Sequence, residues 1–263
     1  MNIPTIVGAY AAMPQEVLDQ EALYRGLAAG GWVDGIEIPY RDGVDADPRW
    51  LADQLRGRFT QCVVTAIPGT MGHLANDPYF GLASSDEEGR QRAMTWIAGL
   101  VDDVRSLHEM VGHPVVRFVE LHSAPSNHAE PTALKASLVE LSGLFADAEL
   151  IPVIEHCDAS DGVGPGEKEF LSLDDEITAL SGMMVSGAGP EVTQYGPAWG
   201  DAHLPLRDDE PTSLLTTDLI GSFMTAARGV QSYQGIKVQT PVDATVEQRL
   251  AMITSIHDAM ASA

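Results

Sequence analysis

The chain has 263 residues, of which 44% are apolar and 20% charged, and these values suit one large globular domain over residues 1–263. Its 15 basic and 38 acidic residues give a formal net charge of −23. A surface this acidic repels phosphate backbones and anionic lipid, so we expect no nucleic-acid partner and no membrane partner.

The N-terminus lacks the basic start and long apolar run of a secretory signal, and no stretch approaches the ~18 apolar residues of a membrane span. The two cysteines, Cys62 and Cys157, lie in or at the end of apolar runs that resemble buried strands. Buried thiols without a disulfide are typical of a reducing compartment, so we expect a cytoplasmic protein.

Apolar β-rich runs alternate with amphipathic stretches along the chain. The expected strands are residues 5–10, 35–40, 61–67, 114–122, 150–156, 182–187 and 234–240. The expected helices are residues 15–29, 48–57, 86–110, 131–145, 172–180, 213–228 and 243–261, and Ser172 is expected to cap the fifth of them. Such alternation predicts a parallel sheet with helices on both faces.

The order of the elements favours a TIM-type (β/α) barrel over an open sheet, because the chain starts with a strand and ends with a helix over this length. No G-x-G-x-x-G or P-loop pattern follows the first strand, so no nucleotide cofactor is expected. Seven strands are recognisable where such a barrel has eight. Either another strand lies hidden in 188–212, or the sixth βα unit is absent. A partly open barrel exposes strand edges, and we expect a homodimer to cover them.

The fourth and fifth expected strands carry the residues best suited to proton transfer. Glu120 and His122 are two residues apart and therefore share one face of the fourth strand. From there they can meet Glu155 or His156 at the end of the fifth. A carboxylate beside an imidazole is what proton abstraction next to a carbonyl needs. The alternative is an internal ion pair that fills a layer of the barrel.

The same stretch is a candidate metal site, because Glu155, His156, Cys157 and Asp158 stand side by side. Alternate residues of a strand face opposite sides, so these four side chains cannot all reach one ion. We expect one divalent ion, Mn²⁺, Mg²⁺ or Zn²⁺, held by a subset led by Glu155. Its further candidate ligands are Glu120, His156 and His203. The alternative is that His156 and Asp158 cap the following loop.

Lys237 lies between apolar neighbours in the last expected strand, and a buried lysine needs a paired acid or a lowered pKa. It is a candidate catalytic residue, either as an anchor and electrostatic stabiliser or through an imine. Glu37 ends the second strand and is a candidate for binding sugar hydroxyls, with Arg41 beside it. The alternative is a buried salt bridge from Glu37 to Arg41 or Lys237.

Two loops supply the remaining substrate-binding candidates. The segment "YGPAWGDAHLP" contains Tyr195, Trp199 and His203, and rings among polar groups predict a sugar-stacking lid or a ligand arm. The alternative is a loop that the Trp199 side chain holds over the barrel mouth without any ligand contact. The glycine-rich "PGTMGH", which ends at His73, is expected to form a loop whose backbone amides receive an anion.

Several motifs together resemble one bacterial family, a domain of unknown function among the xylose-isomerase-like (sugar phosphate isomerase/epimerase) TIM barrels. They are "IVGAYAA", "IEIPY", "TAIPGTMGHLANDPYFGLASSDEEGR", "VELHSAP", "VIEHCDA", "EFLSLDDEI", "MMVSGA" and "YGPAWGDAHLP". The resemblance spans nearly the whole chain and implies the barrel fold. It implies little about the reaction, since one barrel hosts many chemistries.

The chain departs from that resemblance at two points. Members of the family have a further strand between the "SLDDEI" helix and the "MMVSG" strand, and this segment is absent here. The wider superfamily implies a divalent metal held by Glu, Asp, His and Glu on the last four strands. Glu155 matches the first of these ligands, whereas Ser186 and Gln239 stand where others are expected.

These observations favour an isomerase or epimerase that abstracts a proton next to the carbonyl of a small sugar or sugar acid. Two alternatives stay open at this point. One is a lyase or aldolase acting on a small carbohydrate-derived substrate, and the other is a degenerate barrel that binds a sugar without converting it.

Overall fold

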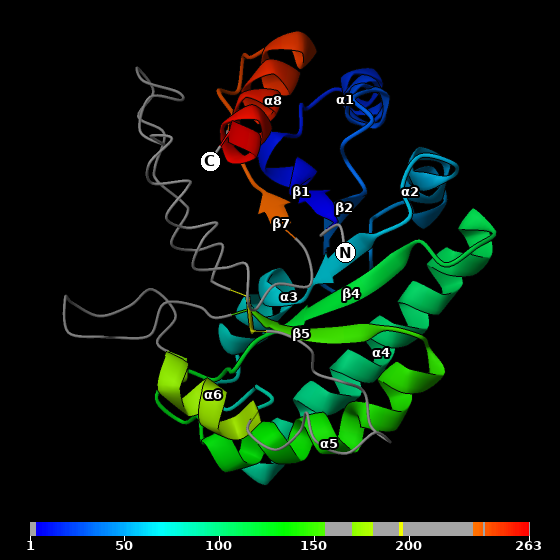
Figure 1. Cartoon of the computed structure of the whole chain (residues 1–263). Helices are drawn as coiled ribbons and strands as arrows, with labels where there is room; N and C mark the ends of the chain where they lie inside the picture. The colour runs from blue at the N-terminus through cyan, green and yellow to red at the C-terminus, as the bar shows by residue number, and fades with distance from the viewer. Residues whose placement is uncertain (1–3, 156–169, 181–194, 197–233, 239, 263) are drawn as a thin grey trace.

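A computed structural model of the chain describes residues 4–155, 170–180, 195–196, 234–238 and 240–262. Within this part of the chain seven strands form one sheet in the order β6-β5-β4-β3-β2-β1-β7 (Figure 1). The strands are β1 Thr5–Val7, β2 Gly35–Pro39, β3 Cys62–Thr65, β4 Val116–Leu121, β5 Ile151–Glu155, β6 Tyr195–Gly196 and β7 Gln234–Ile236.

Every pairing in this sheet is parallel, and the strands follow one another in chain order. The last strand, β7, returns to pair with β1. A sheet that is wound in one direction and brings its last strand back to its first is the arrangement of a TIM-type barrel. The predicted fold class is therefore confirmed.

The helices lie between the strands and cover the outside of the sheet (Figure 1). They are η1 Ala9–Ala12, α1 Val17–Ala29, α2 Pro48–Leu55, α3 Ile67–Leu74, α4 Glu87–Val111, α5 Pro131–Asp147, α6 Leu173–Leu180 and α8 Val246–Ser262. Among the described helices, none is both long and apolar enough to cross a membrane.

Local signals explain where several helices begin and end. Asp47 accepts hydrogen bonds from the backbone amides of Arg49 and Trp50 at the start of α2, and Pro48 follows it. Asp86 caps α4 in the same way, and Gly112 ends that helix with a φ of 93°. The expected cap at Ser172 is confirmed, because its hydroxyl accepts from the Asp175 amide at 3.3 Å.

Two elements differ from the sequence prediction. Residues 67–74, expected as a glycine-rich loop, form α3. Gly69 is enclosed there, since a Cβ atom would lie 2.2 Å from the Trp96 ring and 2.7 Å from the Arg41 carbonyl. Packing thus outweighs the poor helix propensity of glycine. The short strand β6 lies within 188–212, where the sequence left a hidden strand as one alternative, whereas the expected strand 182–187 and helix 213–228 are outside the described residues.

Candidate active site

The inner face of the sheet carries an apolar layer, formed by Ile6, Val63, Phe118 and Val153. Side chains alternate along a strand, so residues two positions further on share this face and lie one step closer to the carboxyl end. Those residues are Gly8, Thr65, Glu120 and Glu155. A layer of polar groups therefore follows the apolar layer at the end of the barrel where TIM-barrel active sites lie.

The pair His122–Glu155 is the best-defined contact of this layer. The imidazole Nε2 lies 2.7 Å from the Glu155 carboxylate Oε2, and the two side chains are 0% and 7% exposed. The His122 Nδ1 atom is buried and has no hydrogen-bond partner among the described residues. The structure thus brings together two of the predicted catalytic residues from neighbouring strands.

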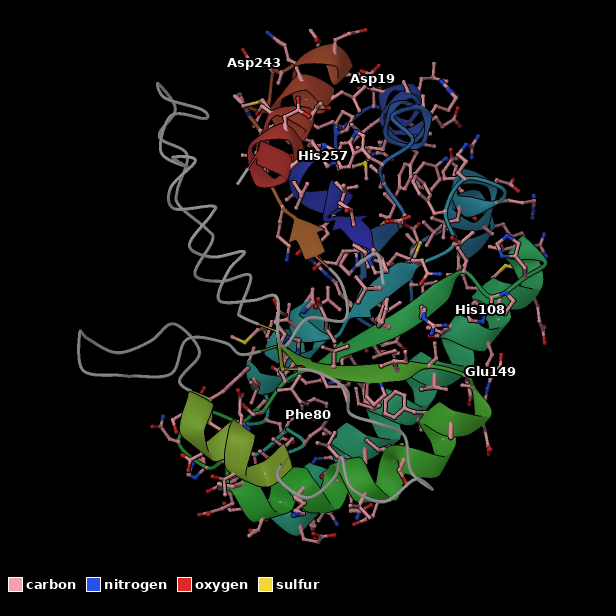
Figure 2. All side chains as sticks on the ribbon, viewed as in Figure 1. Asp19, Phe80, His108, Glu149, Asp243 and His257 are labelled. Atoms are coloured by element: carbon pink, nitrogen blue, oxygen red, sulfur yellow. The ribbon has the colours of Figure 1, made fainter. Side chains whose placement is uncertain are left out.

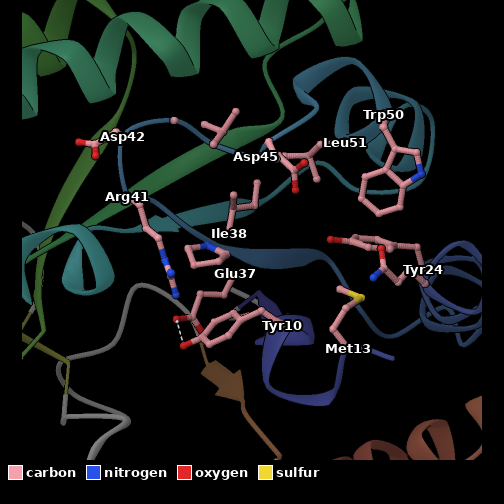
Figure 3. A pocket seen from close by; sticks show the side chains of 15 residues that line it. Tyr10, Met13, Tyr24, Glu37, Ile38, Arg41, Asp42, Asp45, Trp50 and Leu51 are labelled. Atoms are coloured by element: carbon pink, nitrogen blue, oxygen red, sulfur yellow. Dashed lines mark hydrogen bonds between the residues drawn. The ribbon is translucent and has the colours of Figure 1, made fainter. Parts of the chain in front are cut away.

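A second cluster lies where β1, β2 and β7 meet. The Lys237 ammonium is 2.9 Å from Glu37 Oε1, and both side chains are almost fully buried. The Tyr10 hydroxyl donates to the same oxygen at 3.2 Å (Figure 3), and its ring lies 5.0 Å from the Lys237 nitrogen. The salt bridge that the sequence left as an alternative for Glu37 is therefore present.

Gly8 makes the approach of these groups possible. A Cβ atom at this position would lie 2.9 Å from Glu37 Oε2 and 3.0 Å from Lys237 Cγ. Neither Gly8 nor Tyr10 is among the candidates predicted from the sequence. Their position directly after the first strand is the signal that identifies them once the strand is known to end at Val7.

The charges of the two clusters act on one another. Burial by itself lowers the pKa of Lys237, but attraction to Glu37, Tyr10, Glu155 and Glu120 more than offsets this and raises it. Lys237 is therefore a protonated ammonium. Burial raises the pKa of Glu37, Lys237 opposes that shift, and Glu155 reinforces it. Burial also raises the pKa of Tyr10, so its hydroxyl stays protonated.

Glu120 and Thr65 stand between the clusters, on paired strands, and both are 0% exposed. The Thr65 hydroxyl has no hydrogen-bond partner among the described residues. Buried polar groups usually have partners, so this hydroxyl faces the region in which a ligand would be bound. Ser123, directly after His122, donates to Glu176 of α6, and both residues are fully buried. No sequence pattern indicates this pair, whose members lie 53 residues apart.

His73 and Arg41 lie on the rim of the barrel. His73 of α3 stacks on Phe80 at 4.3 Å, and its Nε2 atom is 3.4 Å from Asp42. It thus lies in a helix beside an aromatic surface, and the expected anion-binding loop is not formed. The Arg41 side chain is exposed and extends along the same side as the Tyr10–Glu37 hydrogen bond (Figure 3).

Of the remaining candidate site residues, the structure describes only some. The backbone of Tyr195 pairs with Ile154 in β6, next to Glu155. Trp199, His156 and His203 lie outside the described residues. His108 is excluded from the site, because its ring accepts a hydrogen bond from the Val116 amide at the amino end of β4 (Figure 2).

The described residues do not form a complete metal site. No group of three or more His, Cys, Asp or Glu side chains is placed to hold an ion in this part of the chain. Glu155 and His122 contact each other directly, and two of the predicted ligands, His156 and His203, lie outside the described ranges.

Comparison with known proteins identifies the family. The model of a family described as Domain of unknown function (DUF4862) matches residues 6–181 and 177–252. The chain belongs to this family. The DUF4862 chain is also 29% identical to the uncharacterized protein STM3670 of Salmonella typhimurium, with 90% of each protein covered.

That alignment runs over 285 residues, more than the 263 of this DUF4862 chain, so the relative has internal residues that are missing here. The two ranges matched by the family model overlap at 177–181, and residue 177 is the last residue of "SLDDEI". The break in the family match therefore falls where the sequence suggests a missing segment, and the length of the alignment shows missing residues without placing them.

Solved structures of the same fold show the wider group. The zinc-bound IolI protein is 13% identical, with a TM-score of 0.57 and 99% of each chain covered. A xylose isomerase domain protein of Salmonella typhimurium is also 13% identical, with a TM-score of 0.52 and the same coverage. The DUF4862 chain therefore has a xylose-isomerase-like TIM-barrel fold.

Proposed function

We propose that this protein is an isomerase or epimerase of a small carbohydrate-like substrate that moves a proton at the carbon next to a carbonyl. The observation that supports it most is the buried His122–Glu155 pair, 2.7 Å apart at the carboxyl end of the strands. A carboxylate oriented by an imidazole in a dry site is suited to act as a general base. The fold is shared with a xylose isomerase domain protein, which agrees with this chemistry.

In the proposed reaction Glu155 accepts the proton from the carbon beside the carbonyl. The C–H electron pair forms the double bond of an enediolate, and negative charge develops on the former carbonyl oxygen. The protonated Lys237 stabilises that charge, and His122 holds the Glu155 carboxylate in position. An isomer results when the neighbouring hydroxyl passes its proton to the former carbonyl oxygen and Glu155 returns its proton to the former carbonyl carbon. For an epimer, Glu120 starts protonated and gives its proton to the opposite face of the same carbon, while Glu155 keeps the proton that it removed. Proton exchange with water then resets both acids.

The state of Lys237 distinguishes this proposal from an imine-forming lyase. An imine needs an unprotonated amine, usually produced by a lowered pKa, whereas the surroundings of Lys237 raise its pKa. We therefore expect that borohydride, added during turnover, traps no substrate on Lys237. Covalent labelling of this residue would favour the lyase.

A divalent ion is the second part of the proposal, and its support is the zinc atom bound to IolI, which has this fold. The described residues supply Glu155 and His122 but no third ligand, so the proposed proton transfer does not use the ion. We expect the purified protein to contain about one Mn²⁺, Mg²⁺ or Zn²⁺ per chain. Elemental analysis of the protein and of its Glu155→Gln variant measures this directly.

The function is tested by following aldoses, ketoses and sugar acids with NMR in the presence of the protein. We expect one substrate to be converted into an isomer or epimer, and Glu155→Gln to lower the rate by at least ~10²-fold. Glu109→Gln, on the exposed side of α4, is the matched control and should keep the full rate. Cleavage into smaller fragments would favour the lyase instead. Binding without conversion would favour the non-catalytic barrel.

A further inference from the structure

A cavity of about 530 Å³ opens beside the Glu37 cluster, between the loop after β2 and the helices α1 and α2 (Figure 3). Its volume lies in the usual range of ligand pockets. None of the groups that we assign to proton transfer lines it. The cavity therefore needs its own explanation.

One end of the cavity is polar and belongs to the candidate active site. Glu37 lines it with a side chain that is 0% exposed, and its Oε2 atom has no hydrogen-bond partner among the described residues. Tyr10 lines the same end and is bonded to the other carboxylate oxygen. A buried carboxylate oxygen that lacks a donor is stabilised by a ligand hydroxyl.

The other end is apolar and aromatic. Tyr24 and Trp50 meet edge to face with their ring centroids 5.9 Å apart, and Met13 and Leu51 lie on the same wall, with Asp45 beside Leu51 (Figure 3). The Trp50 indole nitrogen is buried and has no hydrogen-bond partner among the described residues. The nitrogen lies on the side of the ring that points away from the other labelled cavity residues (Figure 3), so the ring itself forms the wall, and aromatic walls of this kind bind apolar groups and rings.

The charges around the cavity disfavour an anionic ligand. Asp42 and Asp45 line it against the single cation Arg41 among the described lining residues, and Lys237 neutralises the third acid, Glu37. The net charge of −23 adds to this repulsion. An uncharged ligand fits, with hydroxyls toward Glu37 and an apolar or aromatic part toward Trp50.

We infer that this cavity is a second subsite, which binds the uncharged apolar or aromatic substituent of a sugar whose ring lies at Glu37. This inference rests on the proposed function and names its substrate class, a carbonyl-containing sugar with such a substituent. The subsite requires no carbonyl, so it can be tested with ligands that cannot react.

The test is calorimetric titration with methyl and phenyl β-glucosides and β-galactosides, and with glucose 6-phosphate as the anion. We expect a phenyl glycoside to bind about tenfold more tightly than its methyl counterpart, and the anion to bind more weakly than either. Trp50→Ala should remove the preference for phenyl. Trp50→Phe should keep most of the preference for phenyl. A loss in Trp50→Ala that Trp50→Phe does not share then comes from the missing ring. Trp32→Ala is the matched control, because Trp32 stacks on His257 and does not line the cavity, and it should keep the full preference.

Equal binding of phenyl and methyl glycosides, no binding of any glycoside, or a preference that survives Trp50→Ala would each overturn the subsite. Glu155→Gln should bind with the same preference, because Glu155 does not line the cavity. A phenyl preference in a protein that converts no sugar retains the subsite and removes the proposed function. Conversion of a sugar by a protein without the phenyl preference retains the proposed function and removes the subsite.

Discussion

Gly8 shows how much the candidate site depends on single atoms. The space that its absent side chain leaves is occupied by the Glu37 carboxylate and the Lys237 chain. Both charged residues can be found in the sequence from their places on strands, but the glycine between them cannot. Such a close approach involves three segments that are distant in sequence, and no local pattern records it.

Gly8→Ala is expected to separate Glu37 from Lys237 and to destabilise the fold by about 1–3 kcal/mol, as overpacking of a buried site does. Urea unfolding measures this. Gly99→Ala in α4 is the matched control, because a Cβ atom at Gly99 would meet nothing within 4 Å. It should stabilise the protein by roughly 0.5–1 kcal/mol. If both substitutions changed the free energy of unfolding equally, the contacts of Gly8 with Glu37 and Lys237 would not restrict the side chain at this position.

Cys62 gives the fold a dependence on alkaline pH. Burial raises the pKa of its thiol to about 12, against about 8.5 in an unfolded chain. The folded state keeps the proton that the unfolded state loses, so stability falls as the pH rises above about 8.5. The loss is about 1.4 kcal/mol per pH unit in this window.

Urea unfolding of the wild type and of Cys62→Ala, from about pH 8 to pH 10, isolates this effect. The stability advantage of the wild type should shrink by about 2 kcal/mol over the range. An advantage that stays constant with pH would contradict a buried, protonated thiol.

Among the helices, α8 ties the loops of the Glu37 cluster together. Its residue Arg249 is 3% exposed and donates to the carbonyls of Ala12 at 3.1 Å and Val242 at 2.8 Å. It also donates to Ala244 at 3.0 Å and to the Thr240 hydroxyl. The 3-10 helix that carries Tyr10 is thereby fixed to the segment that follows β7.

Arg249→Met should therefore lower the free energy of unfolding by about 3 kcal/mol, since it leaves buried carbonyls without a donor. Arg25→Met serves as the control, because Arg25 is exposed and forms one helix ion pair with Glu21 at 3.6 Å. Its loss should cost less than about 1 kcal/mol. Thermal and urea unfolding give both values, and similar losses would show that Arg249 does not hold the loops.

Helices and strands with strong local signals were predictable, and those that depend on packing were not. The apolar spacing of α4 predicts a core stripe that is buried at Ala93, Ile97, Leu100, Val101, Val104 and Leu107. Trp96, which belongs to the same predicted stripe, is only half-buried. By contrast, α3 contains Gly69 and Gly72, and the two-residue strand β6 is shorter than any periodic pattern can reveal. Their existence depends on neighbours that are distant in sequence.

In the molecule as a whole, alternation of strands and helices is sufficient to predict the barrel and the end that carries the polar layer. It also predicts that Glu120, His122 and Glu155 share that end. The contact partner of each residue is harder to predict from the sequence, because strand curvature and side-chain rotamers decide whether His122 contacts Glu155 or another acid. The homodimer stays a prediction, which sedimentation of the intact chain can examine.

The proposed reaction requires that Glu155 moves a proton at the carbon next to a substrate carbonyl. Incubation of sugars with the protein in deuterated water, followed by NMR and mass spectrometry, measures this step even when products resemble substrates. The wild type and the Glu109→Gln control should introduce deuterium at that carbon, and Glu155→Gln should introduce it at least ~10²-fold more slowly. Undiminished exchange by Glu155→Gln, or no exchange by the wild type with any sugar, would contradict the proposed reaction.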